Sequence, residues 1–245
     1  MMSTSKIVLI TGGNKGIGLE TARQLGKLGF TILLGSRDEA RGQEATATLT
    51  AENIHAKAIT LDITDLDTIQ SAVTQIDDQY GALDVLINNA GVCFEGDLPP
   101  SQLELSVLRN TYETNVFGSF SVTKAMLPLI NKSHAGRIVN LSSGLASLTE
   151  YNLPETDAEK YGINLLAYMS SKTAVNAQTV LFAKELKDTP IKINSADPGY
   201  TATDLNGHTG YRTVEQGASI VVKLATLPSH GPSGGFFDEN GVIPW

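Results

Sequence analysis

The chain has 245 residues, of which 41% are hydrophobic and 18% charged, and its formal net charge is −8. This composition is typical of a globular protein and excludes disordered, collagenous and membrane classes. The length suits a single domain over residues 1–245, and the negative charge disfavours nucleic acid as a partner.

The first ten residues lack the basic head and long apolar core of a secretion signal, and no later apolar run reaches about 18 residues. Neither secretion nor membrane attachment is therefore expected. Cys93 is the only cysteine and cannot form an internal disulfide. The histidines are too dispersed for a metal-binding spacing: His55, His134, His208 and His230. We expect a cytoplasmic protein without a metal.

Short apolar runs alternate with longer segments of helical period. The predicted strands span 6–11, 31–34, 56–61, 85–88, 137–141 and 191–195. The predicted helices span 16–28, 38–51, 65–78, 102–129 and 165–186. Apolar strands this short are typical of a parallel sheet covered on both faces. The predicted fold is α/β, a single-domain doubly wound parallel sheet (Rossmann fold) with helices on both faces, which binds ligands at the carboxyl ends of its strands.

The first predicted strand is followed by a glycine-rich segment, Thr11-Gly12-Gly13-Asn14-Lys15-Gly16-Ile17-Gly18. Glycines allow a tight turn there and let backbone N–H groups reach a pyrophosphate, which the helix dipole also favours. The simpler alternative is an ordinary connection between a strand and a helix. The expected cofactor contacts are Gly12, Asn14, Lys15, Gly16, Ile17 and Gly18.

The end of the second strand indicates which cofactor is bound. An acidic residue there would bind the ribose hydroxyls of NAD, whereas arginine accommodates the 2′-phosphate of NADP. Arg37 occupies this place, and Lys15 supplies a second cation for a dianionic group. Asp38 argues against this choice, but it is the expected N-cap of the next helix. The pair favours NADPH/NADP, unless both are solvated surface charges.

Two further strand ends carry candidate cofactor residues. Asp62 and Ile63 follow the third strand, where a carboxylate would lie near the adenine, although Asp62 could instead cap the next helix. Asn89, Ala90 and Gly91 follow the fourth strand, and their small size and amide chemistry suit close passage of a cofactor.

Tyr168 and Lys172 stand four residues apart on a segment of helical period, so their side chains share one face. Reduction of a carbonyl requires a hydride for the carbon and a proton for the oxygen. A nearby ammonium and the positive nicotinamide ring of the oxidised cofactor are expected to stabilise the phenolate and so to lower the tyrosine pKa from about 10. A serine of the preceding pair, Ser142-Ser143, would donate a hydrogen bond to the substrate oxygen.

Together with Asn115, these residues resemble the Asn-Ser-Tyr-Lys tetrad of the classical short-chain dehydrogenase/reductase (SDR) family. The T-G-x-x-x-G-x-G spacing of the glycine segment resembles that family too. The resemblance implies Asn115, Ser143, Tyr168 and Lys172 as catalytic residues, and it alone selects Ser143 over Ser142. It also implies that Asn115 holds a helix bend and a water.

The same resemblance extends the cofactor site and adds a mobile segment. Tyr168 and Lys172 are implied to contact the cofactor, as are four residues after the sixth strand: Pro198, Gly199, Thr201 and Thr203. The stretch at 200–212 is implied to form a flap over the substrate.

Asn14-Lys15, Arg37, a long spacer at about 145–166 and Trp245 resemble the carbonyl reductase branch of the family. The spacer lies beside the helix that compact relatives use to form tetramers, so it favours a monomer over a homodimer or tetramer. The expected substrate residues are Cys93, Phe94, Leu145, Tyr200 and Leu205, with Tyr151 and Trp245 as further candidates. For Cys93 the favoured interpretation is a small hydrophobe of its loop. Such an apolar pocket suits ketones, aldehydes and keto esters.

The sequence therefore predicts an NADPH-dependent carbonyl reductase with Tyr168 as proton donor. Two alternatives on the same fold are a non-catalytic NADP-binding sensor and an alcohol dehydrogenase working mainly in the oxidative direction. A sugar-nucleotide epimerase or dehydratase also uses Tyr-x-x-x-Lys, but the chain after Thr203 is too short for its larger substrate domain.

Overall fold

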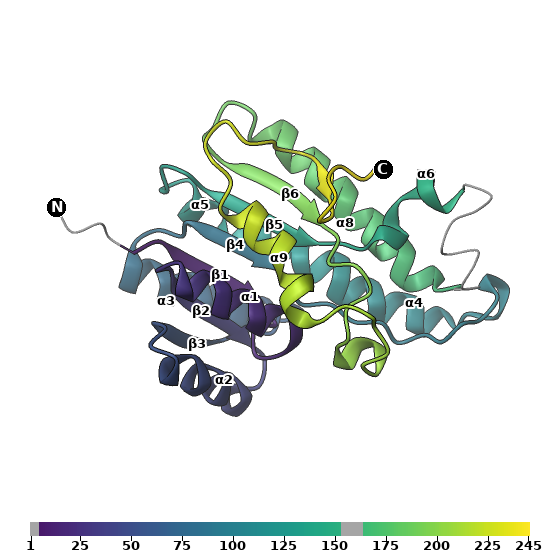
Figure 1. Cartoon of the computed structure of the whole chain (residues 1–245), viewed down its shortest axis with the longest axis horizontal. Coiled ribbons are helices and arrows are strands. Elements are labelled where there is room, and N and C mark those ends of the chain that lie inside the picture. Colours follow the sequence, from purple (N-terminus) through teal and green to yellow (C-terminus); the bar gives the residue numbers. More distant parts are fainter. Residues whose placement is uncertain (1–4, 153–163) are drawn as a thin grey trace.

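A seven-stranded sheet in the order β3-β2-β1-β4-β5-β6-β7 forms the centre of the computed structural model, which describes residues 5–152 and 164–245. All strand pairs are parallel, and the predicted doubly wound fold is confirmed (Figure 1). The strands are β1 Ile7–Thr11, β2 Thr31–Ser36, β3 Ala56–Thr60, β4 Val85–Asn88, β5 Arg137–Leu141, β6 Lys192–Ala196 and β7 Phe236–Phe237.

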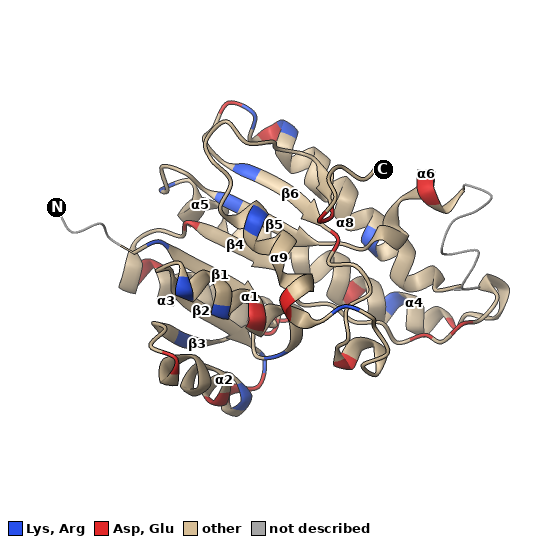
Figure 2. Ribbon diagram, in the orientation of Figure 1, with Lys and Arg blue, Asp and Glu red and all other residues tan. Residues whose placement is uncertain are grey.

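Helices cover both faces of this sheet because its strands are apolar on both sides. In β1, Val8 and Ile10 pack into one core with α1, α2 and α9, while Leu9 packs into a second core with α3 and α5. The charged residues lie mostly on helices and loops (Figure 2). The helices are α1 Gly16–Lys27, α2 Glu39–Ala51, α3 Leu66–Tyr80, α4 Leu105–Tyr112, α5 Ser119–Ile130, α6 Leu148–Tyr151, α8 Leu166–Glu185 and α9 Val214–Ala225.

Aspartates start the two helices that follow β2 and β3. Asp38 accepts a hydrogen bond from the Arg41 N–H at 3.0 Å, which confirms it as the N-cap of α2. The cap of α3 is Asp65, which accepts from the N–H of Asp67 at 2.9 Å. Asp62 therefore does not cap this helix.

The helix predicted over 102–129 is interrupted. A 3₁₀ turn at Pro100–Gln102 (η1) precedes α4, and a π-helical segment at Glu113–Gly118 (η2) separates α4 from α5. The π-helical segment ends at Gly118, which lies so close to Ile63 that an added Cβ would stand 2.8 Å from the Ile63 side chain. The periodicity predicted helical structure correctly here, but it carries no signal for the wider π turn.

Three elements, α6, α9 and β7, were not predicted. The start of α9 does carry a capping box, in which Thr213 and Gln216 bond each other's backbone N–H groups. β7 has only two residues, too few to show a period, and it exists because Phe236 and Phe237 pair with β6.

The spacer before α8 is described in part. It contains a 3₁₀ turn at Gly144–Ala146 (η3) and α6, while residues 153–163 lie outside the described part of the chain. The last residue meets this region: the Trp245 carbonyl accepts from the Thr149 N–H at 3.0 Å, and its ring stacks on Phe236.

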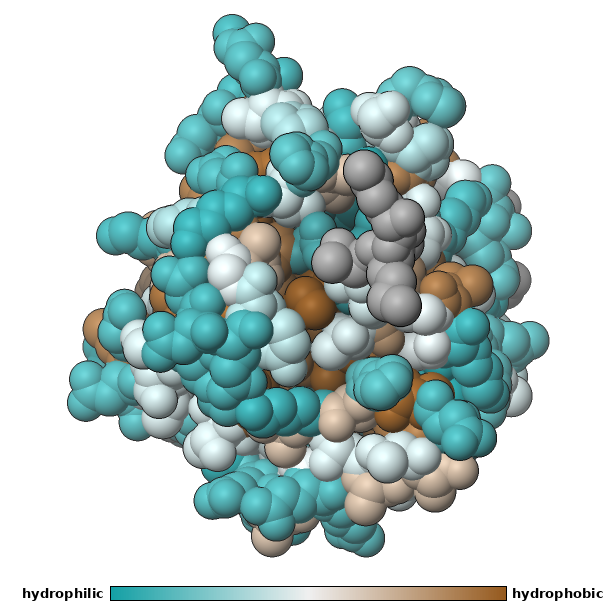
Figure 3. Space-filling model, turned by 90° about the vertical axis from the view of Figure 1, so that its left-hand side faces the viewer, coloured by the Kyte–Doolittle hydropathy of each residue, from teal (hydrophilic) through white to brown (hydrophobic). Residues whose placement is uncertain are grey.

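On the face shown in Figure 3, hydrophilic side chains predominate and hydrophobic ones occupy small areas between them. No helix within residues 5–152 and 164–245 combines the length and apolar character needed to cross a membrane.

Candidate functional site

The glycine segment forms a tight turn between β1 and α1, held from β4. Asn89 donates through Nδ2 to the carbonyls of Thr11 at 2.8 Å and Gly12 at 3.0 Å. An added Cβ at Gly18 would stand only 2.5 Å from that same Nδ2, so only glycine lets Asn89 approach. The Asn89 side chain therefore shapes the turn, and Ile17 packs against the core beneath it.

The start of α1 leaves its backbone donors available. Gly16 has φ +56°, a conformation that favours glycine. Lys15, the N-cap residue, makes no side-chain capping bond, and the first turn of α1 contains no acidic residue. A helix start of this kind presents N–H groups and positive dipole charge, which suits a phosphate.

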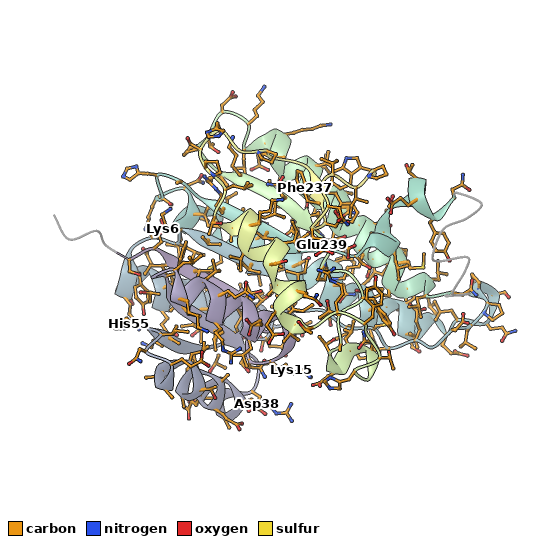
Figure 4. All side chains as sticks on the ribbon, viewed as in Figure 1. Lys6, Lys15, Asp38, His55, Phe237 and Glu239 are labelled. Atoms are coloured by element: carbon orange, nitrogen blue, oxygen red, sulfur yellow. The ribbon has the colours of Figure 1, made fainter. Side chains whose placement is uncertain are left out.

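The two predicted cations follow neighbouring strands. Lys15 lies at the end of the β1 turn, and the exposed Arg37 precedes Asp38 at the end of β2, which pairs with β1 (Figure 4). Lys15 Nζ stands 2.7 Å from Asp204 Oδ2, so it connects the glycine turn to the predicted flap. Asp204 begins a 3₁₀ turn at Asp204–Asn206 (η4) and also contacts His208.

The remaining predicted cofactor residues differ in their side-chain roles. Asp62 accepts from the N–H and hydroxyl of Thr64, and Ile63 is buried. Thr201 is buried and donates to the Pro198 carbonyl, which holds the Pro198-Gly199 turn. Thr203 lies beside the glycine turn, where its Cγ2 would be 3.5 Å from a Cβ built on Gly16.

Asn115 lies inside the π-helical segment, and its amide connects three parts of the chain. Its Oδ1 accepts from the Val92 N–H at 2.8 Å, while its Nδ2 donates to the Val92 carbonyl and to Ser171 Oγ, both at 2.9 Å. Ser171 in turn donates to the Tyr168 carbonyl. A buried amide with all of these bonds fixes the segment after β4 relative to α8.

The neighbouring serines have different partners. Ser142 is buried, and its hydroxyl donates to the Lys172 carbonyl at 3.4 Å. Ser143 follows β5 and is hydrogen-bonded to the Tyr168 side chain. The two hydroxyls, which residue chemistry could not distinguish, are thus separated by the fold.

Tyr168 and Lys172 are brought together on α8, with Lys172 Nζ 5.7 Å from the centre of the tyrosine ring. Nζ donates to the Leu141 carbonyl at 2.8 Å. Gly91 lies against this group, since a Cβ added there would stand 3.3 Å from Nζ and 3.4 Å from Asn115 Oδ1. The tetrad residues therefore lie together next to the end of β4.

Burial determines the protonation of this pair. Burial raises the pKa of the Tyr168 phenol, and the hydrogen bond with Ser143 lowers it only in part. Burial also lowers the pKa of Lys172 to about 8. Burial is thus the main influence on the phenol of the chain alone. The lowering expected from the Lys172 ammonium together with the nicotinamide ring stays a prediction.

The predicted substrate residues differ in their surroundings. Cys93 contributes to the raised pKa of Tyr168, and burial raises the pKa of its own thiol. Phe94, Tyr200 and Leu205 are exposed, and Leu145 is half-buried after Ser143. Trp245 packs on Phe236 and Tyr200 packs on Tyr211. A separate cavity lies between α1 and the segment predicted to form a flap, and none of the predicted substrate residues lines it. Its lining includes Gly16, Leu19, Thr203, Asp204, Tyr211 and Val214.

Several polar residues at the site were missed. Glu95 binds the first turn of α8, and Asp197 accepts from the Gly199 N–H at 2.9 Å while lying against Gly144. A buried row of hydrogen bonds joins β4, β5, α8 and β6 through Asn88, Asn140, Thr179 and Ser195. The partners of these hydrogen bonds lie far apart in the sequence. The only sequence signal for these residues was that several of them are polar residues at strand ends.

Comparison with known proteins places this geometry in context. The family model described as short chain dehydrogenase matches residues 6–212. The chain is 34% identical to the NADPH carbonyl reductase 1 of Homo sapiens over 282 aligned residues, with all of both chains covered. It is 33% identical to (+)-neomenthol dehydrogenase of Capsicum annuum over 308 aligned residues, with 98% of each covered.

A solved structure shares the whole fold. The NADPH-bound carbonyl reductase from chicken fatty liver matches with a TM-score of 0.85 and 25% identity, covering 99% of this chain and 100% of that one.

Proposed function

Because this chain belongs to the short-chain dehydrogenase family, in its carbonyl reductase-like branch, we propose that it is an NADPH-dependent reductase of ketones, aldehydes and keto esters. The observation that carries the proposal is the meeting of Ser143, Tyr168 and Lys172 beside the end of β4. Its product is an alcohol, with Tyr168 as the proton donor.

The residues present fit the cofactor. The uncapped start of α1 and the positive φ of Gly16 provide a phosphate cradle, and Lys15 and Arg37 are the cations for the 2′-phosphate. The remainder of the proposed cofactor path is bordered by Asn14, Ala90, Gly91, Thr203 and Lys172. When bound, the cofactor supplies a hydride for the carbonyl carbon.

The chain itself handles the substrate oxygen and its proton. Ser143 donates a hydrogen bond to the carbonyl oxygen, which orients it and stabilises the negative charge that develops there. The Tyr168 phenol then gives its proton to that oxygen. Lys172 stabilises the resulting phenolate, and Asn115 keeps α8 in register with the segment after β4.

The Tyr168 phenol is in the protonated form that a proton donor requires. Its ordinary pKa already lies well above neutral pH, and burial raises it further.

Oxidation of NADPH, measured by absorbance with a panel of ketones, aldehydes and keto esters, tests the proposal, with NADH run in parallel. We expect turnover that prefers NADPH. NADPH binding without turnover of any panel member would favour the sensor alternative.

The Tyr168→Phe variant tests the proton donor. We expect it to lose about 100-fold or more in kcat, within the range that general acid catalysis contributes. NADPH binding, measured by fluorescence titration, should stay unchanged because the phenol hydroxyl is not part of the phosphate cradle. Turnover close to that of the unmodified protein would exclude Tyr168 as the donor.

We further propose that the protein works in the cytoplasm. Its single cysteine, which cannot form an internal disulfide, supports a reducing compartment. Fractionation of cells that express the tagged chain tests this location.

A further inference from the structure

Helix α8 carries Tyr168 in its first turn, and its own sequence does not cap that turn. The N-cap residue, Leu165, makes no side-chain capping bond, and no acidic residue lies in the first turn. The first N–H groups of a helix have no partner within the helix. These N–H groups of α8 are therefore bound either by a residue outside the helix or by water.

Glu95 provides that partner from a distant part of the chain. Its Oε1 accepts from the Tyr168 N–H at 2.6 Å and its Oε2 accepts from the Ala167 N–H at 3.1 Å. A carboxylate at a helix start is also favoured by the helix dipole. The bond of Oε1 is made to the backbone of the proposed proton donor itself.

Glu95 is held in turn by the site it supports. It belongs to the short segment after β4, in which the backbone of Val92 is bound on both sides by Asn115. Asn115 also binds Ser171, whose hydroxyl bonds the Tyr168 carbonyl. The backbone of Tyr168 is therefore fixed at its N–H by Glu95 and at its carbonyl through Ser171.

We propose that Glu95 is a positioning residue for Tyr168, whose carboxylate caps α8 and so sets where the phenol stands relative to Ser143 and Lys172. This inference rests on the proposed role of Tyr168 as proton donor. Cys93 and Phe94 lie between the two anchored residues, Val92 and Glu95, so the same cap places the expected substrate wall beside the phenol.

The chain offers a matched control two residues away. Asp97 anchors the same segment, accepting from the N–H and Nδ2 of Asn164 at 2.9 and 3.1 Å, but it bonds no amide of α8. Asp97→Asn therefore removes a carboxylate charge from the same segment and leaves the cap of α8 intact. Glu95→Gln keeps the length of the side chain and one acceptor oxygen, whereas Glu95→Ala removes both.

The experiment compares the three variants with the unmodified protein in kcat, KM for the carbonyl substrate, NADPH affinity and hydrogen exchange of the peptide that begins α8. For Glu95→Ala we expect kcat to fall about tenfold, because small displacements of a reacting group slow catalysis steeply. Exchange at Ala167 and Tyr168 should accelerate while NADPH affinity stays unchanged. Glu95→Gln should recover part of kcat, and Asp97→Asn should retain all of it.

Three outcomes would overturn the inference: unchanged kcat in Glu95→Ala, equal losses in Glu95→Ala and Asp97→Asn, or loss of thermal stability without change in the kcat of the folded protein. The Tyr168→Phe variant separates this failure from failure of the proposed function. If Tyr168→Phe is inactive while Glu95→Ala is fully active, only the positioning role is wrong.

Discussion

Lys172 keeps its ammonium in a buried position, bonded to the Leu141 carbonyl. Burial lowers its pKa to about 8, against an ordinary 10.5. Between those two values the unfolded chain binds more protons than the folded one, so the free energy of unfolding rises with pH as this group discharges. The charged form of Lys172 thus lowers the free energy of unfolding near neutral pH. The proposed reaction nevertheless requires this charge.

We predict that Lys172→Met removes this pH dependence. From about pH 7 to about pH 9, the free energy of unfolding of the unmodified protein should gain about 1 kcal/mol relative to the variant. Urea unfolding of both proteins at the two pH values measures the difference. Parallel changes in the two proteins would mean that Lys172 titrates as an ordinary exposed lysine.

Arg37 is an exposed residue at the end of β2, directly before the cap of α2. We predict that Arg37→Asp shifts preference from NADPH to NADH by about 100-fold in the ratio of kcat/KM values, because an anion would repel the 2′-phosphate and bind the ribose hydroxyls. Arg41→Asp, on the exposed side of α2, is the control. An unchanged NADPH/NADH ratio in Arg37→Asp would show that other groups bind the 2′-phosphate.

At the scale of elements, the bridge from Lys15 to Asp204 joins the glycine turn to η4. Both side chains are more than half exposed, and exposed ion pairs of this kind are weak. If Lys15 binds the 2′-phosphate as we propose, Asp204 and the cofactor compete for this one cation.

We predict that Asp204→Asn tightens NADPH binding by about two- to fivefold, which matches an exposed ion pair, and changes NADH binding less. Fluorescence titrations with both cofactors measure the dissociation constants. Glu215→Gln, a substitution of an exposed carboxylate at the start of α9, serves as the control. Equal effects on the two cofactors would mean that Lys15 does not bind the 2′-phosphate.

At the scale of the whole molecule, one sheet extends through all seven strands, and we propose that residues 1–245 form one domain. The spacer contributes α6 beside η3, which contacts α8. Apolar side chains nevertheless remain exposed on α8 and on the segments that contact it, including Phe117, Phe120 and Leu181. A second copy would have to cover these residues.

We predict a monomer, because the spacer adds η3, which contacts α8, and α6, which contacts η3, next to the helix that a partner would use. Size-exclusion chromatography with light scattering should give the mass of one chain, 26.0 kDa, and thermal unfolding should show a single transition. A mass of two or four chains would contradict this. In that case Phe120→Glu should restore the single-chain mass.

The sequence by itself determined the parallel α/β fold and indicated the glycine turn, Arg37, the pair Ser142-Ser143, Tyr168 and Lys172 as candidate site residues. These features are local: strand and helix periods are written in consecutive residues, and functional side chains of this fold follow directly after strands. The capping role of Asp38 could be predicted for the same reason. The capping box of Thr213 and Gln216 is also a local pattern, so the start of α9 could have been predicted from it, although α9 was not predicted.

Only the tertiary structure decided the contacts between residues far apart in the chain. Glu95 caps α8 from a segment 73 positions away, and the pairing of Ser143 rather than Ser142 with Tyr168 depends on how β5 meets α8. β7 forms because β6 offers it a free edge, and the raised phenol pKa follows from burial on all sides. Burial and remote hydrogen bonds are properties of the packed chain, and no local pattern encodes them.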